Sequence, residues 1–160
     1  MTDDKAPPTQ AVAALRKQGI EFTFHFYGYR KDAVTRAAAL EVGVDEHSVV
    51  KTLVMETGEG DALIVLMHGD SWVSTKSLAR QMGVKTVKPS SPKDAERLTG
   101  YRVGGISPFG TKMKLPVYIE ETILDIPRIL INGGRRGFLL ELATQDLIKV
   151  LNPTPVNVAR

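Results

Sequence analysis

The 160-residue sequence contains no cysteine, which excludes disulfide bonds, thiolate metal sites and a cysteine nucleophile. Only 6% of its residues are aromatic, so we do not expect a surface that stacks many bases. No two of the three histidines have the spacing of metal ligands. No hydrophobic run is long enough to span a bilayer, and the acidic N-terminus is unlike a secretory signal. We therefore expect a cytoplasmic protein without a metal, a cofactor or a membrane partner.

The remaining composition is that of a soluble globular domain. Hydrophobic residues make up 42% and charged residues 24% of the chain, whose length suffices to bury a core. The formal net charge of +3 permits a polyanionic partner without requiring one. The sequence shows neither an internal repeat nor a linker between domains. We expect a single domain over residues 1–160, with tails at residues 1–8 and 153–160.

Hydrophobic periodicity and capping residues predict short helices interleaved with strands. The expected helices cover residues 10–18, 33–42, 75–82, 92–99 and 145–151, the last capped by Thr144. The expected strands cover residues 20–27, 49–55, 62–67, 84–87, 116–120, 129–131 and 137–142. The glycine-bearing turn ETGEGD predicts a hairpin between the second and third strands, and ALIVLM is typical of a strand buried on both faces. This order indicates a mixed α/β (α+β) domain rather than a doubly wound parallel sheet.

The glycine-rich stretch 100–114, GYRVGGISPFGTKMK, is the most unusual part of the chain. It has too many glycines for a helix or a regular strand, and it is too apolar for a disordered linker. We expect an ordered loop whose backbone approaches another group, because glycine has no Cβ to intervene. The pair Gly104-Gly105 would free N–H groups to bind an anion or an oxyanion. A tight turn, with Ser107 extended before Pro108, explains the same residues equally well.

Two further segments carry cations that suit either a surface or a site. Lys51, in the strand VVKTLVM, would either be solvated or point into a pocket and meet a phosphate or a carbonyl oxygen. Thr52 would face the opposite side of the sheet, so both residues line one pocket only where the strand ends or bulges. The segment NGGRRG at residues 132–137 is either a solvated hairpin or a phosphate-binding turn.

Three motifs in this order, VVKTLVM, GYRVGGISPFGTKMKLPVYIE and INGGRRGFLLELATQDLIKVL, resemble the YbaK/EbsC family of free-standing trans-editing domains. These domains are similar to the editing insertion of bacterial prolyl-tRNA synthetase. The resemblance covers roughly residues 9–151. It implies a mixed α/β fold with a curved, barrel-like sheet and an aminoacyl-tRNA deacylase that acts on mischarged tRNA. Aminoacyl-tRNA is the implied partner, and prolyl-tRNA synthetase is a further candidate.

The resemblance also implies roles for individual residues. The expected catalytic groups are Lys51, Gly104 and Gly105. The expected substrate-binding residues are Tyr27, Thr52, Ile106, Ser107, Pro108, Asn132, Gly133 and Leu139. The clustering of cationic residues, rather than the resemblance, suggests the expected tRNA contacts, which are Arg102, Lys112, Lys114, Arg135 and Arg136.

Two positions depart from the cysteine-specific branch of the family, in which a serine stands at position 132 and an aspartate at position 139. Asn132 and Leu139 occupy these positions here, and loss of polar partners changes substrate preference. The expected substrate is therefore Cys-tRNA(Pro) or another small aminoacyl-tRNA, attacked by the substrate's own thiol or by water. The same two departures keep open a non-catalytic nucleotide- or tRNA-binding module.

Overall fold

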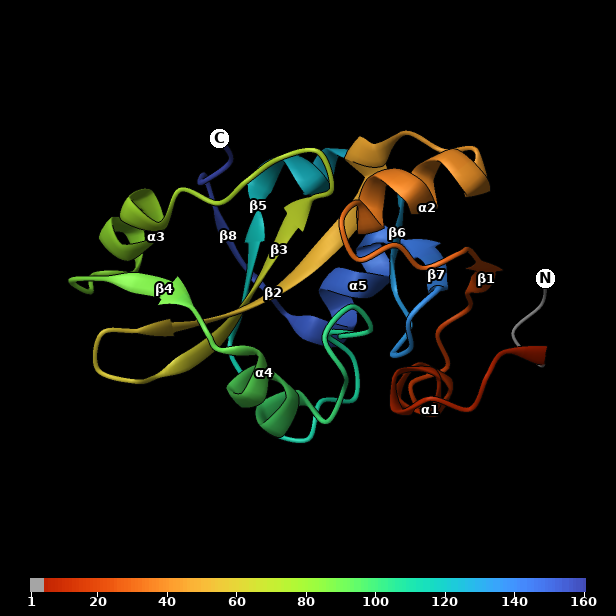
Figure 1. The fold of residues 1–160 in the computed structure, drawn as a ribbon, viewed down its shortest axis with the longest axis horizontal. Helices are drawn as coiled ribbons and strands as arrows, with labels where there is room; N and C mark the ends of the chain where they lie inside the picture. Colours follow the sequence, from red (N-terminus) through yellow and green to blue (C-terminus); the bar gives the residue numbers. More distant parts are fainter. Residues whose placement is uncertain (1–4) are drawn as a thin grey trace.

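The computed structural model describes residues 5–160, which form one mixed α/β domain (Figure 1). The helices are α1 (Gln10–Lys17), α2 (Val34–Val42), α3 (Thr75–Met82), α4 (Pro92–Thr99) and α5 (Thr144–Leu151), with short 3₁₀ helices η2 (Glu46–Ser48) and η3 (Glu121–Asp125). The strands are β1 (Thr23–Phe26), β2 (Val49–Thr57), β3 (Ala62–His68), β4 (Val87–Pro89), β5 (Val117–Glu120), β6 (Arg128–Asn132), β7 (Phe138–Ala143) and β8 (Thr154–Val156).

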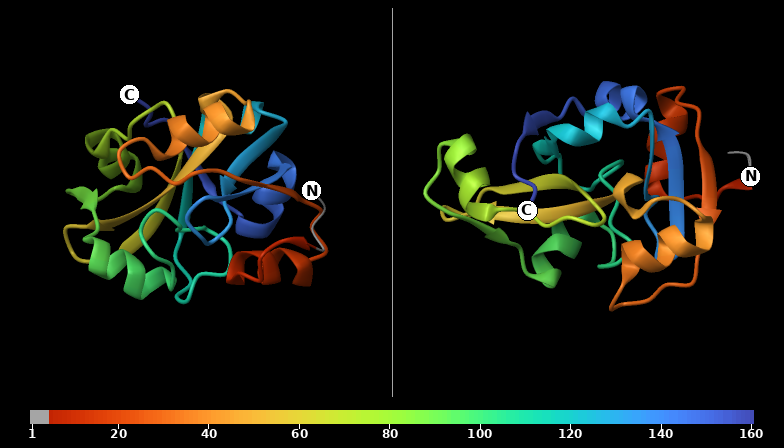
Figure 2. Two further views of the ribbon diagram at one scale, coloured as in Figure 1. Left: turned by 45° about the vertical axis from the view of Figure 1, so that its right-hand side comes forward. Right: turned by 90° about the horizontal axis from the view of Figure 1, so that it is seen from above.

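All the strands belong to one mixed sheet with the order β1-β7-β6-β2-β3-β5-β8, and β4 pairs with β2 beside this path. The hairpin β2–β3 is antiparallel as predicted, whereas β2–β6, β3–β5 and β5–β8 are parallel. The prediction of a mixed α/β domain with a mixed sheet is confirmed. Figure 2 shows that the sheet curves strongly, since β1 and β7 run at a steep angle to β2 and β3.

The helix boundaries with clear capping signals lie where the sequence predicts them. The Ser91 side chain accepts from the backbone N–H of Asp94, Pro92 begins α4, and Gly100 ends it with a φ of 80°. The cap predicted at Thr144 is wrong, because Ala143 is the N-cap and the Thr144 hydroxyl donates to the carbonyl of Ile126. The strand predicted at residues 84–87 lies instead at β4, because pairing with β2 fixes its position. The first strand is shorter than expected.

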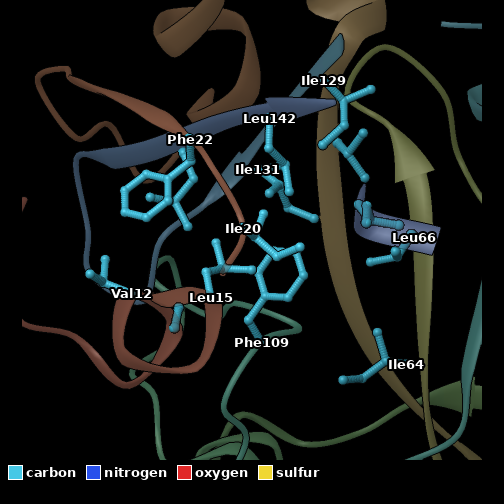
Figure 3. Close-up of a cluster of buried hydrophobic side chains, with 14 of the residues drawn as sticks. Val12, Leu15, Ile20, Phe22, Ile64, Leu66, Phe109, Ile129, Ile131 and Leu142 are labelled. Atoms are coloured by element: carbon cyan, nitrogen blue, oxygen red, sulfur yellow. The ribbon is translucent and has the colours of Figure 1, made fainter. Parts of the chain in front are cut away.

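Strand β3 separates two hydrophobic clusters, as a strand buried on both faces should. Its Ile64 and Leu66 point into the larger cluster, which Figure 3 shows between the sheet and α1. Leu15 of α1 and Phe109 of the glycine-rich stretch pack in the same cluster and are almost fully buried. Val65 on the opposite face of β3 packs against α3. The glycine-rich stretch is therefore anchored in the core.

The C-terminal segment is not the tail that the sequence suggests. Strand β8 pairs in parallel with β5, and Val156 and Val158 are buried. The backbones of Trp72 and Arg160 exchange two hydrogen bonds of 2.9 Å. At the other end, residues 1–4 of the expected tail lie outside the described residues, and Ala6 packs against the core. None of the helices within residues 5–160 has the length and apolar character needed to cross a membrane.

Candidate active site

A gap in the sheet along one edge of β2 positions the site. On this edge β2 pairs with β6 only at Val49 and Val50, and its pairing with β4 begins at Met55. No strand covers this edge between them within the described part of the chain. A cavity of about 550 Å³ lies here, and residues 49–53 of β2 form one of its walls.

The other walls come from elements far apart in the sequence. They comprise the start of α2, the loop at residues 103–106 and the ends of β6 and β7. The lining residues outside β2 are Tyr27, Lys31, Asp32, Ala33, Val34, Thr35, Arg36, Ala38, Glu46, Gly69, Trp72, Val103, Gly104, Ile106, Asn132 and Leu139. Within the described residues, no serine, cysteine or histidine lines this cavity.

Lys51 enters the cavity with its ammonium group fixed. Its Nζ donates to the carbonyl oxygen of Ser71 at 2.8 Å and lies 4.2 Å from the ring centroid of Trp72. Burial lowers the pKa of Lys51, although the nearby carboxylates of Glu46 and Asp70 oppose this shift. An ammonium group has three donor hydrogens, so Lys51 retains donors for a substrate oxygen.

Thr52 also lines the cavity, although it follows Lys51 directly along the strand. Alternation places the two side chains on opposite faces of β2, and the gap beside the strand exposes both faces to the cavity. On the uncovered edge of β2, the carbonyl oxygen of Val54 accepts from the backbone N–H of Ser90. Backbone groups two residues apart in a strand point to the same edge, so those of Thr52 also face the gap. The Thr52 hydroxyl is buried and has no hydrogen-bond partner among residues 5–160.

Asn132 ties two loops together. Its side-chain nitrogen donates to the carbonyl oxygens of Gly104 and Arg135, each at 3.2 Å. Its side-chain oxygen accepts from the backbone N–H groups of Gly134 at 2.7 Å and Arg135 at 3.1 Å. Asn132 therefore positions the 103–106 loop against the turn between β6 and β7. The sequence alone did not reveal this role.

The glycines of the 103–106 loop meet specific packing demands. Gly104 has a φ of 89°, and a Cβ there would lie 2.5 Å from the hydroxyl oxygen of Tyr29. The N–H of Gly105 donates to the carbonyl of Arg102, which closes the turn. The backbone N–H groups of Gly104 and Ile106 have no acceptor within residues 5–160. Because both residues line the cavity, their N–H groups are better candidates for binding an anion than that of Gly105.

The apolar end of the cavity is formed by one small cluster. Tyr27, Ala38, Val49 and Leu139 pack together there, next to β6 and α2. Burial raises the pKa of the Tyr27 phenol. The Tyr27 hydroxyl is a second buried oxygen without a hydrogen-bond partner in the described chain. A bound molecule would meet an apolar surface with one hydroxyl here.

A comparison with known protein families identifies the family of the chain. The model of the aminoacyl-tRNA editing domain matches residues 31–150. The chain belongs to the aminoacyl-tRNA editing domain family. EbsC of Enterococcus faecalis, named a candidate Cys-tRNA(Pro)/Cys-tRNA(Cys) deacylase, is 27% identical over 145 residues, or 90% of this chain and 88% of EbsC. The multifunctional Ser/Thr-tRNA deacylase ProXp-y of Escherichia coli is 24% identical over 93% of this chain and 90% of its own.

The editing-domain fold also appears among solved structures. A crystal structure described as a candidate trans-editing enzyme for prolyl-tRNA synthetase superimposes with a TM-score of 0.84. It covers 98% of this chain and 99% of the other chain at 22% identity. This likeness concerns the fold and is consistent with the family assignment.

The editing domain brings only part of the expected site into the cavity. The expected residues that line it are Tyr27, Lys51, Thr52, Gly104, Ile106, Asn132 and Leu139. Those buried outside the lining are Gly105, Ser107, Pro108 and Gly133. Ser107 is fully buried, and its hydroxyl accepts from the backbone N–H of Phe109 at 3.3 Å. The geometry therefore gives Ser107 a turn-forming role.

The expected tRNA contacts all lie on the surface. Arg102, Lys112, Lys114, Arg135 and Arg136 are exposed, and none of them lines the cavity. Arg136 donates from Nε to the carbonyl of Val103 at 2.8 Å and lies over the ring of Tyr29. This contact joins the turn between β6 and β7 to the 103–106 loop, which lines the cavity.

The start of α2 is the part of the site that sequence reasoning missed. The N-cap, Ala33, makes no side-chain hydrogen bond to the helix, and Ala33 to Arg36 line the cavity. Uncapped N–H groups and the helix dipole attract anions. Thr35 donates to Glu46 at 2.8 Å and to the carbonyl of Gly69 at 3.1 Å, which fixes this end of α2. No sequence pattern places this end of α2 beside Lys51, so only the structure reveals it.

Folding also brings His47, His68 and Asp70 together, with ligand atoms within 4.8 Å of one another. The two imidazole rings stack 3.6 Å apart at 9°. Because a metal lies near the plane of each imidazole that binds it, parallel stacked rings are poorly arranged to share one ion. Both ring nitrogens of His68 are also engaged, by the carbonyl of His47 and by Thr122. Hydrogen bonds account for this cluster.

Proposed function

We propose that this editing domain is a trans-acting deacylase that hydrolyses the ester of mischarged aminoacyl-tRNA. The supporting observation is that Lys51, the uncapped start of α2 and the free N–H groups of Gly104 and Ile106 surround one cavity. Such groups stabilise phosphate and oxyanion charge. Charged tRNA would be met in the cytoplasm, and prolyl-tRNA synthetase is a candidate partner there.

The reaction needs no side-chain nucleophile. Water adds to the ester carbonyl, and the resulting oxyanion accepts from the N–H groups of Gly104 and Ile106. The bond to the ribose oxygen then breaks, and that oxygen takes up a proton. Lys51 holds the ribose–phosphate side of the substrate. A substrate that carries a thiol can instead supply its own nucleophile.

The apolar end of the cavity suggests which aminoacyl groups fit. Leu139 and Val49 offer no ion-pair partner, and the Tyr27 hydroxyl offers one polar contact. A small uncharged side chain, as in alanyl-, seryl- or cysteinyl-tRNA, suits these walls better than a charged one. The likeness to EbsC makes Cys-tRNA(Pro) one member of this group.

Incubation with a panel of labelled aminoacyl-tRNAs tests the proposal. At substoichiometric protein we expect multiple turnovers with small uncharged aminoacyl groups and much slower release of charged ones. Saturable binding without release of the amino acid would contradict the proposal and support a binding module instead.

Lys51→Ala is expected to lower kcat/KM about a hundredfold, because a charge-assisted contact to the substrate is lost. Lys149→Ala is a matched control, since Lys149 is exposed on α5 outside the cavity, and we expect it to stay near the wild-type rate. Wild-type activity in Lys51→Ala would remove Lys51 from the mechanism.

A further inference from the structure

A second groove adjoins the active-site cavity. Its volume is about 440 Å³, and it shares four lining residues with the first cavity. The shared residues are Thr52, Leu53, Trp72 and Val103. The groove therefore continues the site past Lys51 toward β4 and α4. A substrate longer than the aminoacyl ester would extend into it.

Trp72 stands at the junction of the two spaces. Its side chain is 69% exposed, which is unusual for the largest apolar side chain, and the Lys51 ammonium approaches its ring. Its backbone is held by two hydrogen bonds to Arg160, and the next residue, Val73, forms a bridge with Ala159. The indole is thus presented to solvent from a fixed backbone.

The groove beyond Trp72 has polar lining residues among apolar ones. The Ser90 hydroxyl is buried there without a hydrogen-bond partner in residues 5–160, as is that of Thr52. Arg160 lines the groove, and no acidic residue of the described chain does. Lys88, which precedes Pro89, and Lys93, which follows Pro92, are exposed, as is Glu96, whose carboxylate accepts from the backbone N–H of Val103 at 2.9 Å.

These features together match an unpaired nucleotide. Bases stack on exposed aromatic rings, their edges need hydrogen-bond partners, and their phosphates are attracted by cations. We propose that the second groove holds a base of the single-stranded 3′ end of tRNA. The base stacks on Trp72, and its edge is hydrogen-bonded by the Ser90 hydroxyl or by the backbone groups of Thr52 on the uncovered edge of β2. This inference rests on the proposed function, since the aminoacyl ester occupies the first cavity.

Trp72 is the only tryptophan in the sequence, so intrinsic fluorescence reports directly on it. We would titrate the whole protein with the ribotrinucleotide CCA and with an abasic ribose-phosphate trimer of equal charge. Saturable quenching by CCA, and little by the abasic trimer, is expected. Equal quenching by both would mean that only phosphates are bound, and would overturn the proposal, as would the absence of quenching by CCA.

Deacylation kinetics provide an independent readout. Trp72→Ala is expected to raise KM about tenfold, because stacking of the base on the indole is lost. Trp72→Phe retains an aromatic ring and is expected to have a KM close to that of wild type. Leu40→Ala, at a 75% exposed position on α2 outside both spaces, should leave KM unchanged. An unchanged KM in Trp72→Ala would overturn the subsite while leaving the deacylase intact. Base-dependent quenching without any deacylation would instead refute the proposed reaction and leave the subsite standing.

Discussion

The Glu120 carboxylate fastens the C-terminal segment to the sheet. It is only 1% exposed and accepts from the backbone N–H groups of Val158 at 2.7 Å, Ala159 at 2.9 Å and Thr122 at 3.3 Å. Burial alone would raise the pKa of Glu120, but these donors together lower it below its usual value. The carboxylate is therefore stabilised in its charged form, and its removal should destabilise the fold.

Glu120→Ala leaves three backbone N–H groups without their acceptor. At about 1 kcal/mol for each net hydrogen bond, the free energy of unfolding should fall by about 3 kcal/mol. Urea unfolding measured by circular dichroism gives this value, and Trp72 fluorescence reports whether the attached segment loosens first. The exposed neighbour Glu121 provides the control, since Glu121→Ala should change the free energy of unfolding by less than about 0.5 kcal/mol. A loss below about 1 kcal/mol in Glu120→Ala would refute the reasoning.

The same carboxylate predicts a pH dependence with a definite sign. Because the folded pKa of Glu120 is depressed, its contribution is fully present above the unfolded value of about 4.3 and is lost as pH falls through the lower folded pKa. The difference in unfolding free energy between wild type and Glu120→Gln should shrink below about pH 4. A difference that stays constant from about pH 7 to about pH 3 would contradict this assignment.

Substitutions at two positions test the loops around the cavity. Gly104→Ala places a Cβ against Tyr29 at a positive φ, so we expect thermal unfolding to show a loss of about 1–2 kcal/mol, with lower deacylation. A variant as stable and active as wild type would contradict the need for glycine there. Asn132→Ala removes the hydrogen bonds that join the loops and should lower kcat at least about tenfold. Asn132→Asp keeps the acceptor for the N–H groups of Gly134 and Arg135, so its kcat should lie between those of wild type and Asn132→Ala. Equal kcat in wild type, Asn132→Ala and Asn132→Asp would show that the hydrogen bonds between these loops do not affect catalysis.

The parts of the fold that the sequence predicts are those with local causes. The cap at Ser91, the proline after it and the left-handed Gly100 act within one helix, and they place α4 correctly. The prediction of a tail at residues 153–160 is wrong, although the two prolines of this segment favour a loosely packed end. Its order depends on Glu120, which lies 38 residues before Val158 in the chain. No local pattern reveals a contact of that kind.

The candidate site likewise combines residues that the sequence predicts with residues that only the fold brings together. The motif order points to Lys51 and Gly104, but the period of a strand argues against Lys51 and Thr52 lining one pocket. The structure resolves this conflict because no strand pairs with this edge of β2 between Val50 and Met55, so both faces of the strand open to the cavity. This gap is a property of the whole sheet. The first turn of α2 is likewise ordinary in sequence and gains its role only from its place beside the gap.

The C-terminal segment is connected to Lys51 through the backbone of Ser71 and Trp72. The segment holds the backbone of Trp72, and the preceding carbonyl, that of Ser71, accepts the hydrogen bond from Lys51. Loss of the Glu120 anchor should therefore disturb Lys51 before it disturbs the sheet, since β2 keeps its pairing with β3. In Glu120→Ala, a fall in kcat/KM at urea concentrations where circular dichroism is still native would reveal this linkage. Activity that is lost only with the sheet would show that the Lys51 contact does not depend on the segment.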